Sequence, residues 1–353
     1  MKHKPAPPNS STNPVDLRAL ADIVERFEGK RVVVLGDFVA DSFQYGDITR
    51  VSREAPVLIL RHRETRLLPG GAANATNNFA ALGAHAFPIT VVGHDQAGNW
   101  LLRTFREKRL DVSGILRSKT ATTPTKTRFL AGWTHTVGHQ VLRVDYEPQT
   151  PIADSESSKI ASLLSAKLKS ADALAISDYG LGVVSPQLVK TALSKSKRSI
   201  PVSLDSRYQL TAYANSGVTT ATPNEPEIEA LQNTAIGQNL SALERSGRRI
   251  LSLMKLRSLL ITRGKHGMAL FQPKLPTVHI PVHGSDQAVD VTGAGDTVLA
   301  VYTLALASSA SPLEAAHIAN IAGGLVVMKR GTATVSRAEL LDAIHKSASE
   351  VST

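Results

Sequence analysis

The amino-acid sequence predicts an α/β fold, a doubly wound and mostly parallel sheet sandwiched by helices, with a small antiparallel β lid. Short apolar runs rich in β-branched residues alternate along the chain with helical patterns, which is typical of parallel sheets. Several of these runs end in polar residues, as at Gly36-Asp37 and Ser177-Asp178. Since ligands of such folds bind at the carboxyl ends of the strands, a binding site is predicted there.

The lid is predicted from two segments that break this alternation. Within 43–62 and within 125–146 the pattern is strand-like, and no helix separates the two halves of either segment. The second segment contains a turn near residues 136–138. Such strands suit a cover over the ligand crevice or a contact between two subunits. We therefore expect a homodimer formed through the lid.

The other elements follow in chain order. A helix is predicted over 16–27, where apolar residues recur at helical spacing, and the first strand over 31–35. Further strands are predicted at 86–92, 173–176, 201–204 and 258–262. Helices are predicted at 72–82, 155–168, 186–193 and 240–253.

The chain is predicted to form one large domain. Its 353 residues are 42% hydrophobic, which is enough apolar material for a full core. Residues 1–15 are rich in Pro, Ser and Asn and read as a disordered tail, and 346–353 as a C-terminal tail. The domain therefore spans 16–345.

Composition excludes several classes of function. The net charge is +10, but the basic residues are dispersed, so nucleic-acid binding is not expected, whereas phosphorylated substrates suit a basic surface. The absence of cysteine excludes disulfides and thiolate chemistry and fits a reducing cytoplasm. No apolar run approaches the roughly 20 residues that span a bilayer, so no membrane partner is expected.

The strongest motif is Asp-Val-Thr-Gly-Ala-Gly-Asp-Thr at 290–297, directly before an apolar helical run. Its glycines open the backbone at a helix start, where unpaired N–H groups and the helix dipole bind anions. Asp296 cannot be a ligand for an anion, but it suits a base beside a phosphoryl group in transfer. The alternative is a glycine-rich helix cap in which Asp296 only complements the helix dipole.

A second motif surrounds the start of the helix predicted at 72–82. Gly70 and Gly71 allow a ligand close to the backbone, and the Asn74 amide can bind sugar hydroxyls. Asp37 and Asp41 add carboxylates that accept hydrogen bonds from hydroxyls. The alternatives are that Asp37 caps a turn and that Asn74 satisfies backbone groups.

Together, Gly-Gly-Ala-Ala-Asn at 70–74 and the motif at 290–297 resemble the two signatures of the ribokinase-like (PfkB) carbohydrate kinases, whose fold is a Rossmann-like sandwich with a β lid. Motifs at 50–57, 142–147, 177–179 and 331–336 resemble, in the same order, the family members that act on D-glycero-D-manno-heptose 7-phosphate in ADP-heptose synthesis. The resemblance covers about residues 16–345.

The resemblance implies an enzyme that uses ATP and Mg²⁺ to phosphorylate the anomeric hydroxyl of heptose 7-phosphate. Asp296 would be the base, while the N–H groups at Gly293, Ala294 and Gly295 would stabilise the transferred phosphoryl group. Mg²⁺ would be placed, through water, by Asn224 and Glu227. The nucleotide would be bound by Thr262, Gly264, Gly267, Asn320 and Gly323. The acceptor would be bound by Asp37, Asp41, Gly70, Gly71, Asn74, Arg143, Asp178 and Arg207.

Three departures from similar heptose kinases bear on the substrate. Ser42 stands where a basic residue is common, Leu181 where a lysine is common, and Arg207 in an Asp-Ser-Arg segment where Asp-Pro-Lys is common. Arg207 is expected to restore phosphate binding, because arginine contacts phosphate in a bidentate manner. The alternatives are a ribokinase-like kinase of another sugar, sugar phosphate or nucleoside, and a non-catalytic binding protein of the same fold.

Overall fold

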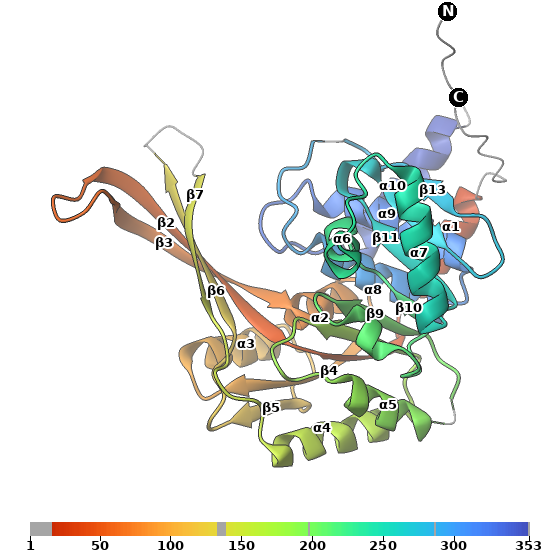
Figure 1. Cartoon of the computed structure of the whole chain (residues 1–353), viewed down its shortest axis with the longest axis horizontal. Coiled ribbons are helices and arrows are strands. Elements are labelled where there is room, and N and C mark those ends of the chain that lie inside the picture. The colour runs from red at the N-terminus through yellow and green to blue at the C-terminus, as the bar shows by residue number, and fades with distance from the viewer. Residues whose placement is uncertain (1–15, 133–138, 197, 286, 352–353) are drawn as a thin grey trace, which may run out of the picture.

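The structure is a computed structural model that describes residues 16–132, 139–196, 198–285 and 287–351 (Figure 1). The helices are α1 Leu17–Glu25, α2 Ala72–Ala81, α3 Gln96–Glu107, α4 Asp154–Lys167, α5 Pro186–Ser194, α6 Glu225–Gln232, α7 Leu240–Met254, α8 Ala294–Ala307, α9 Pro312–Val326 and α10 Arg337–Val351. The strands are β1 Arg31–Gly36, β2 Phe38–Val51, β3 Leu58–Gly71, β4 His85–Gly93, β5 Ile115–Ser118, β6 Thr125–Gly132, β7 His139–Tyr146, β8 Ala173–Asp178, β9 Val202–Ser206, β10 Thr220–Ala221, β11 Ser258–Thr262, β12 Met268–Phe271 and β13 Val278–Ile280.

The main sheet confirms the predicted doubly wound architecture. Nine of the described strands form it, in the order β13-β12-β11-β10-β9-β8-β1-β4-β5. The pairings from β5 through to β11 are parallel, and the last two strands, β12 and β13, are added in antiparallel pairings. From β1 the chain proceeds to β4 on one side and later to β8 on the other. The switch point, where folds of this kind bind ligands, therefore lies at the carboxyl ends of β1 and β8.

The apolar strands are buried on both faces of this sheet, as a parallel sheet requires. In β1, Val32 and Val34 belong to one core, with residues of α1, α2, α3, α8, α9 and α10. Val33 and Leu35, which alternate with them, belong to a second core with residues of α4, α5, α6 and α7. Alternation along one strand thus joins the two helical layers.

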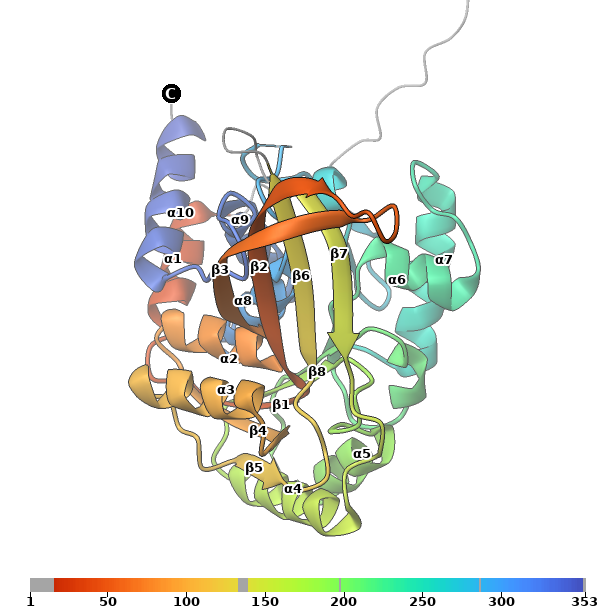
Figure 2. The ribbon, with the colours of Figure 1, turned by 90° about the vertical axis from the view of Figure 1, so that its left-hand side faces the viewer.

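The lid is a separate four-stranded sheet, in the order β3-β2-β6-β7, that extends from the main body (Figures 1 and 2). It is mixed, and in this detail the prediction of an antiparallel lid is wrong. The pairs β2–β3 and β6–β7 are antiparallel, but β2 and β6 pair in parallel. Both strands leave the main body at the same end of the lid, where Ala40 lies opposite Thr125, and the pairing continues to Asp47 opposite Gly132.

Two predicted boundaries also differ from the structure. The lid strands are longer than predicted: β2 begins at Phe38, so only Asp37 separates it from β1. β3 continues to Gly71, well beyond residue 62, so α2 follows it directly. The segment predicted as a tail from residue 346 is helical as far as Val351, because α10 continues. The turn predicted near 136–138 and the tail at 1–15 lie outside the described residues. Among the helices that the structure describes, none combines the length and hydropathy needed to cross a bilayer.

Candidate active site

Asp296 lies buried in the first turn of α8, with 2% of its surface exposed. Its Oδ2 accepts a hydrogen bond of 2.8 Å from the Asn74 side-chain amide, and its Oδ1 accepts one of 3.2 Å from the Tyr179 hydroxyl. Burial raises the pKa of Asp296 to about 7, although these two hydrogen bonds act in the opposite direction. A carboxyl group with this pKa exchanges its proton near neutral pH, as a general base does.

Two helix N-termini meet at this carboxylate. α8 is capped by Gly293, whose φ of +79° suits glycine, and a Cβ there would lie 2.5 Å from the Asn74 amide nitrogen. α2 is capped by Gly71, whose φ of +56° is also left-handed, and a Cβ there would lie 2.7 Å from the carbonyl oxygen of Asp37. Gly293 is therefore required by the close packing of α2 on α8, and Gly71 by its close approach to the backbone at Asp37.

Asp37 is fully buried and is engaged within the protein. Its Oδ2 accepts hydrogen bonds from the backbone N–H groups of Tyr179 and Leu181, and its Oδ1 accepts one from Val183. Burial raises its pKa to about 6, against the effect of these hydrogen bonds. The carboxylate thus anchors the loop that carries Tyr179, as the turn-capping alternative predicts, and it presents no exposed surface to a sugar.

Other residues predicted to bind the acceptor are close by but partly engaged. Asp41 forms an ion pair with Arg128 and lies against Gly70, where a Cβ would be 2.1 Å from Asp41 Oδ2. Asp178 is buried and accepts hydrogen bonds from the side chains of Ser206 and Tyr213. The structure thus uses Asp178 to join neighbouring loops.

The two predicted arginines come from different sheets, Arg143 from the lid and Arg207 from the end of β9 in the main sheet. Arg143, on β7 of the lid, forms a two-pronged ion pair with Asp145, with distances of 2.7 and 2.6 Å. Arg207 follows β9 and has an exposed side chain, while its backbone N–H donates to the carbonyl of Asp178. Arg207 and Arg143 both act electrostatically on Lys126, so the three cations lie near one another.

Three residues at this site were missed by the sequence reasoning: Tyr179, Lys126 and Asp205. Tyr179 belongs to the segment 177–179, and that motif was the signal that could have identified it. Lys126 alternates with Arg128 along β6, which marks one face of a lid strand. Asp205 ends an apolar run, and its Oδ2 lies 3.8 Å from where a Cβ of Gly295 would be.

Asn224 and Glu227 form a capping box at the start of α6. The Asn224 side chain accepts from the Glu227 N–H, and the Glu227 carboxylate accepts from the Asn224 N–H. Burial raises the pKa of Glu227, and burial together with the charge of Glu227 raises the pKa of Asp205 well above its usual range. No group of three or more ligating side chains is found among the described residues. Two neighbouring carboxylates, Asp205 and Glu227, nevertheless fit Mg²⁺, which keeps several waters and substrate oxygens as ligands.

The residues predicted to bind the nucleotide fall into two groups. Thr262, at the end of β11, forms a bridge to Asn224 and so adjoins the carboxylates. The second group consists of Gly267, Asn320 and Gly323. The Asn320 amide donates to the carbonyl of Pro281 at 2.8 Å. Met268, which follows Gly267, lies against the Gly323 position. Gly264 has no atom within 4 Å of a Cβ at its position.

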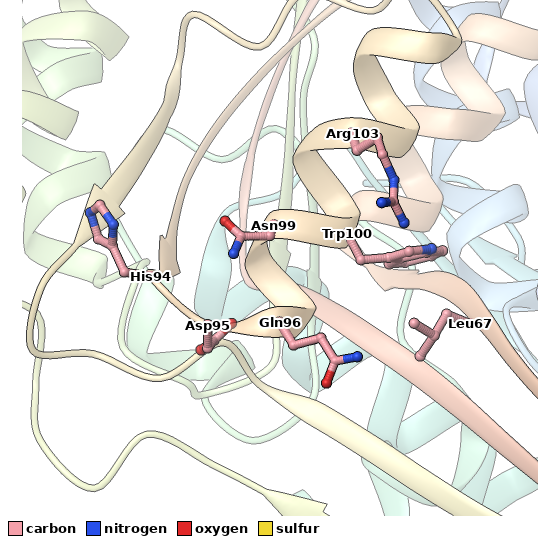
Figure 3. A pocket seen from close by; sticks show the side chains of 7 residues that line it. All are labelled: Leu67, His94, Asp95, Gln96, Asn99, Trp100 and Arg103. Atoms are coloured by element: carbon pink, nitrogen blue, oxygen red, sulfur yellow. The ribbon is translucent and has the colours of Figure 1, made fainter.

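A pocket of about 420 Å³ lies elsewhere, between β3 and the start of α3 (Figure 3). It is lined by Leu67, His94, Asp95, Gln96, Asn99, Trp100 and Arg103. None of the predicted site residues lines it. This pocket is therefore separate from the candidate active site, which consists of Asp296 and the residues that contact it.

Several known proteins resemble this chain in sequence. The family described as "pfkB family carbohydrate kinase" matches residues 30–339. The bifunctional protein HldE of Geobacter metallireducens is 40% identical over 311 residues, covering 88% of this chain and 62% of the relative. HldE of Caulobacter vibrioides is 39% identical over 326 residues, covering 91% and 65%. The chain thus spans somewhat less than two thirds of the length of these relatives.

Solved structures support the fold. Phosphofructokinase-2 from Escherichia coli, in complex with potassium, superposes with a TM-score of 0.73 at 19% identity, covering 91% of this chain and 99% of that one. Ribokinase from Arabidopsis thaliana, complexed with ribose and ATP, gives a TM-score of 0.70 at 17% identity, covering 90% and 99%. At such identities the likeness concerns the fold, which is ribokinase-like.

Proposed function

Since the chain belongs to the pfkB family of carbohydrate kinases, we propose that it transfers the γ-phosphoryl group of ATP to a hydroxyl of a phosphorylated sugar. The observation that carries this proposal is the Asp296 carboxyl, buried at the N-terminus of α8 with a pKa raised to about 7. A helix start attracts phosphate, so a base at that position stands beside the group in transfer.

In the proposed reaction, Asp296 takes the proton of the acceptor hydroxyl as its oxygen attacks the γ-phosphorus, and the bond from phosphorus to the bridging oxygen of ADP breaks. Asn74 and Tyr179 hold the two carboxylate oxygens in place. The backbone N–H groups at Gly293, Ala294 and Gly295 stabilise the charge on the transferred phosphoryl group. Thr262, Gly264, Gly267, Asn320 and Gly323 are proposed to bind the nucleotide.

Mg²⁺ is proposed to be held, through water, near Asn224 and Glu227, with Asp205 as a further carboxylate. Burial raises the pKa of both carboxyl groups, and the charge of Glu227 raises the pKa of Asp205 further, so a divalent cation bound beside them would favour their ionised forms. When bound, the metal neutralises charge between the β- and γ-phosphates of ATP.

The proposed acceptor is D-glycero-D-manno-heptose 7-phosphate, phosphorylated on its anomeric hydroxyl. The ordered motifs along the chain support this substrate, as do the cations Lys126, Arg143 and Arg207 on either side of the crevice. Asp41, Gly70, Gly71 and Asn74 are proposed to bind the sugar, and Asp37 and Asp178 to position the loops around it. A kinase of another sugar, sugar phosphate or nucleoside remains the alternative.

The test is ATP turnover with heptose 7-phosphate, fructose 6-phosphate, ribose, adenosine and unphosphorylated heptose. Preference for heptose 7-phosphate is expected. Asp296→Asn serves as the blank and should lower kcat by about 10²- to 10⁴-fold while nucleotide binding is retained. Preference for another acceptor would reject the heptose assignment, and full activity of Asp296→Asn would reject the base.

We also propose a homodimer formed through the lid. Large apolar side chains are exposed along its strands and hairpin, at Val51, Val57, Leu58, Val141, Leu142 and Tyr146. Large apolar side chains that are exposed on one small sheet favour an interface there. Sedimentation of the wild type beside Leu142→Lys should show a dimer that the substitution weakens, whereas a wild-type monomer at micromolar concentration would reject the proposal.

A further inference from the structure

The lid carries charged residues on the face that looks into the crevice. On three adjacent strands, Asp41 lies opposite Lys126, and Lys126 lies opposite Asp145. Two residues further along, Arg128 lies opposite Arg143. Because side chains along a strand alternate between faces, all five belong to one face, here called the lid ionic face.

Four of these five residues are paired. Arg128 pairs with Asp41, and Arg143 pairs with Asp145. Lys126 lies between the two pairs, with only 9% of its surface exposed. In the part of the chain that the structure describes, its ammonium group makes no hydrogen bond and no ion pair. The lid ionic face therefore has one buried cation in excess.

The position of Lys126 links it to the candidate base. Its Nζ lies 4.7 Å from the centre of the Tyr179 ring, and the hydroxyl of that ring donates to Asp296 at 3.2 Å. The Tyr179 side chain thus contacts the Lys126 ammonium group with its ring and the Asp296 carboxylate with its hydroxyl. A ligand with an anion at one end and a hydroxyl at the other can reach both.

The charges around Lys126 favour an anionic ligand. Burial lowers the pKa of Lys126, and the positive charges of Arg207 and Arg143 act in the same direction, against Asp41 and Asp145. A buried ammonium group without a carboxylate or carbonyl partner is costly, and the aromatic face of Tyr179 offsets only part of this cost. A phosphate monoester carries two negative charges and enough acceptor oxygens for several cations.

We propose that Lys126, together with Arg207 and Arg143, binds the phosphate that the acceptor sugar already carries. This inference rests on the proposed function and deepens it, since it assigns the residues that would select a phosphorylated sugar over a free one. In this chain, where Leu181 and Ser42 carry no charge, Lys126 supplies a positive charge from β6.

The experiment measures the affinity of heptose 7-phosphate and of unphosphorylated heptose by calorimetry, with ADP present, for the wild type, Lys126→Met and the exposed control Lys119→Met. We expect Lys126→Met to weaken binding of heptose 7-phosphate about 10- to 100-fold, as for the loss of a charge-assisted hydrogen bond. Binding of unphosphorylated heptose should change less than about twofold, and Lys119→Met should match the wild type.

Equal binding of heptose 7-phosphate by Lys126→Met and the wild type would overturn the proposal. So would an equal loss for both acceptors, or a fall in kcat with unchanged affinity, because Lys126 would then act on the transferred group. If Lys126→Met does not fold, as judged by circular dichroism, sulfate is titrated against the wild type instead. Sulfate should compete with heptose 7-phosphate and not with unphosphorylated heptose, and the absence of this difference overturns the proposal.

This binding assay is independent of turnover. A wild-type protein that binds heptose 7-phosphate through Lys126 but does not phosphorylate it would contradict the proposed function alone. Turnover of heptose 7-phosphate with unchanged affinity in Lys126→Met would contradict the assignment of Lys126 alone.

Discussion

The Asn74 amide on α2 donates a hydrogen bond of 2.8 Å to Oδ2 of Asp296 on α8, across 222 residues of sequence. The same nitrogen lies 3.4 Å from the carbonyl oxygen of Gly293, so one side chain contacts both the cap and the first turn of α8. The two motifs of the sequence, at 70–74 and 290–297, are therefore halves of one site. The hydrogen bond favours the ionised form of a carboxyl group that burial would otherwise keep protonated.

The first prediction concerns pH. We expect kcat/KM of the wild type to rise with pH through about 7, because Asp296 must lose its proton to act as a base. Tyr179→Phe removes a hydrogen bond to the ionised carboxylate, so the pKa should rise further and the acidic limb should move to higher pH. The profile of the exposed control Tyr208→Phe should stay in place. An unmoved limb in Tyr179→Phe would mean that this hydrogen bond does not act on the base.

The second prediction concerns stability. The pKa of Asp296 is raised from 3.8 to about 7 on folding, so its contribution to stability is full below pH 4 and is lost as the pH rises toward 7. At pH 8, Asp296→Asn should therefore have a larger free energy of unfolding than the wild type, by about 4 kcal/mol at most, as measured by urea unfolding. The difference should shrink at pH 5.5. A variant less stable than the wild type at pH 8 would contradict the burial cost assigned to this carboxyl.

The third prediction concerns the loop that Asp37 anchors. Asp37→Ala leaves three backbone N–H groups, one buried and two partly buried, without their acceptor, so the free energy of unfolding should fall by about 3 kcal/mol. Asp37→Asn keeps one acceptor oxygen and should lose less. Urea unfolding of both variants beside the wild type is the measurement, and an unchanged midpoint for Asp37→Ala would argue against the anchoring role.

The fourth prediction compares two glycines in the predicted nucleotide region. A Cβ at Gly267 would lie 2.0 Å from the carbonyl oxygen of Ile280, whereas a Cβ at Gly264 meets no atom within 4 Å, and both residues have positive φ. Gly264→Ala should cost only the left-handed strain of about 1–2 kcal/mol. Gly267→Ala should cost more and also raise the KM for ATP, because β12 and β13 must separate. Equal thermal shifts for the two variants would contradict the close approach.

The fifth prediction concerns the metal. Chelation with EDTA should abolish turnover, and added Mg²⁺ should restore it. Asp205→Asn should raise the Mg²⁺ concentration for half-maximal activity about tenfold, in the range of losses seen when a group near a metal is changed. The exposed control Asp111→Asn should leave the dependence unchanged. If Asp205→Asn responds to Mg²⁺ like the wild type, Asp205 takes no part in the metal site.

The main sheet could be predicted because its signal is local. The runs at 86–92 and 173–176 are apolar except for Thr90, which indicates burial on both faces, and they form β4 and β8. The parallel pairing of β2 with β6 could not be predicted, because it depends on where two distant strands begin. Residue types alone do not specify that arrangement.

The candidate site shows the same division. Asp296 and the glycines around it were identified from the motif at 290–297, since a glycine-rich helix start has a known chemical meaning. Asp37 was predicted to bind a sugar, and in the structure its carboxylate accepts from backbone groups at 179–183, in the loop that follows β8. Lys126 was missed, because its burial, and the absence of an ion-pair partner for it among the described residues, are properties of the folded lid.

The hairpin of β2 and β3 joins the body without a flexible connection, since one residue links β1 to β2 and α2 follows β3 at once. The base of the lid therefore has no loop residue other than Asp37 on one side, and on the other side its backbone passes directly into the first turn of α2, which carries Asn74. We therefore expect a change in lid position to be felt at Asn74. Since Asn74 donates to Asp296, such a change would be coupled to the orientation of the Asp296 carboxylate.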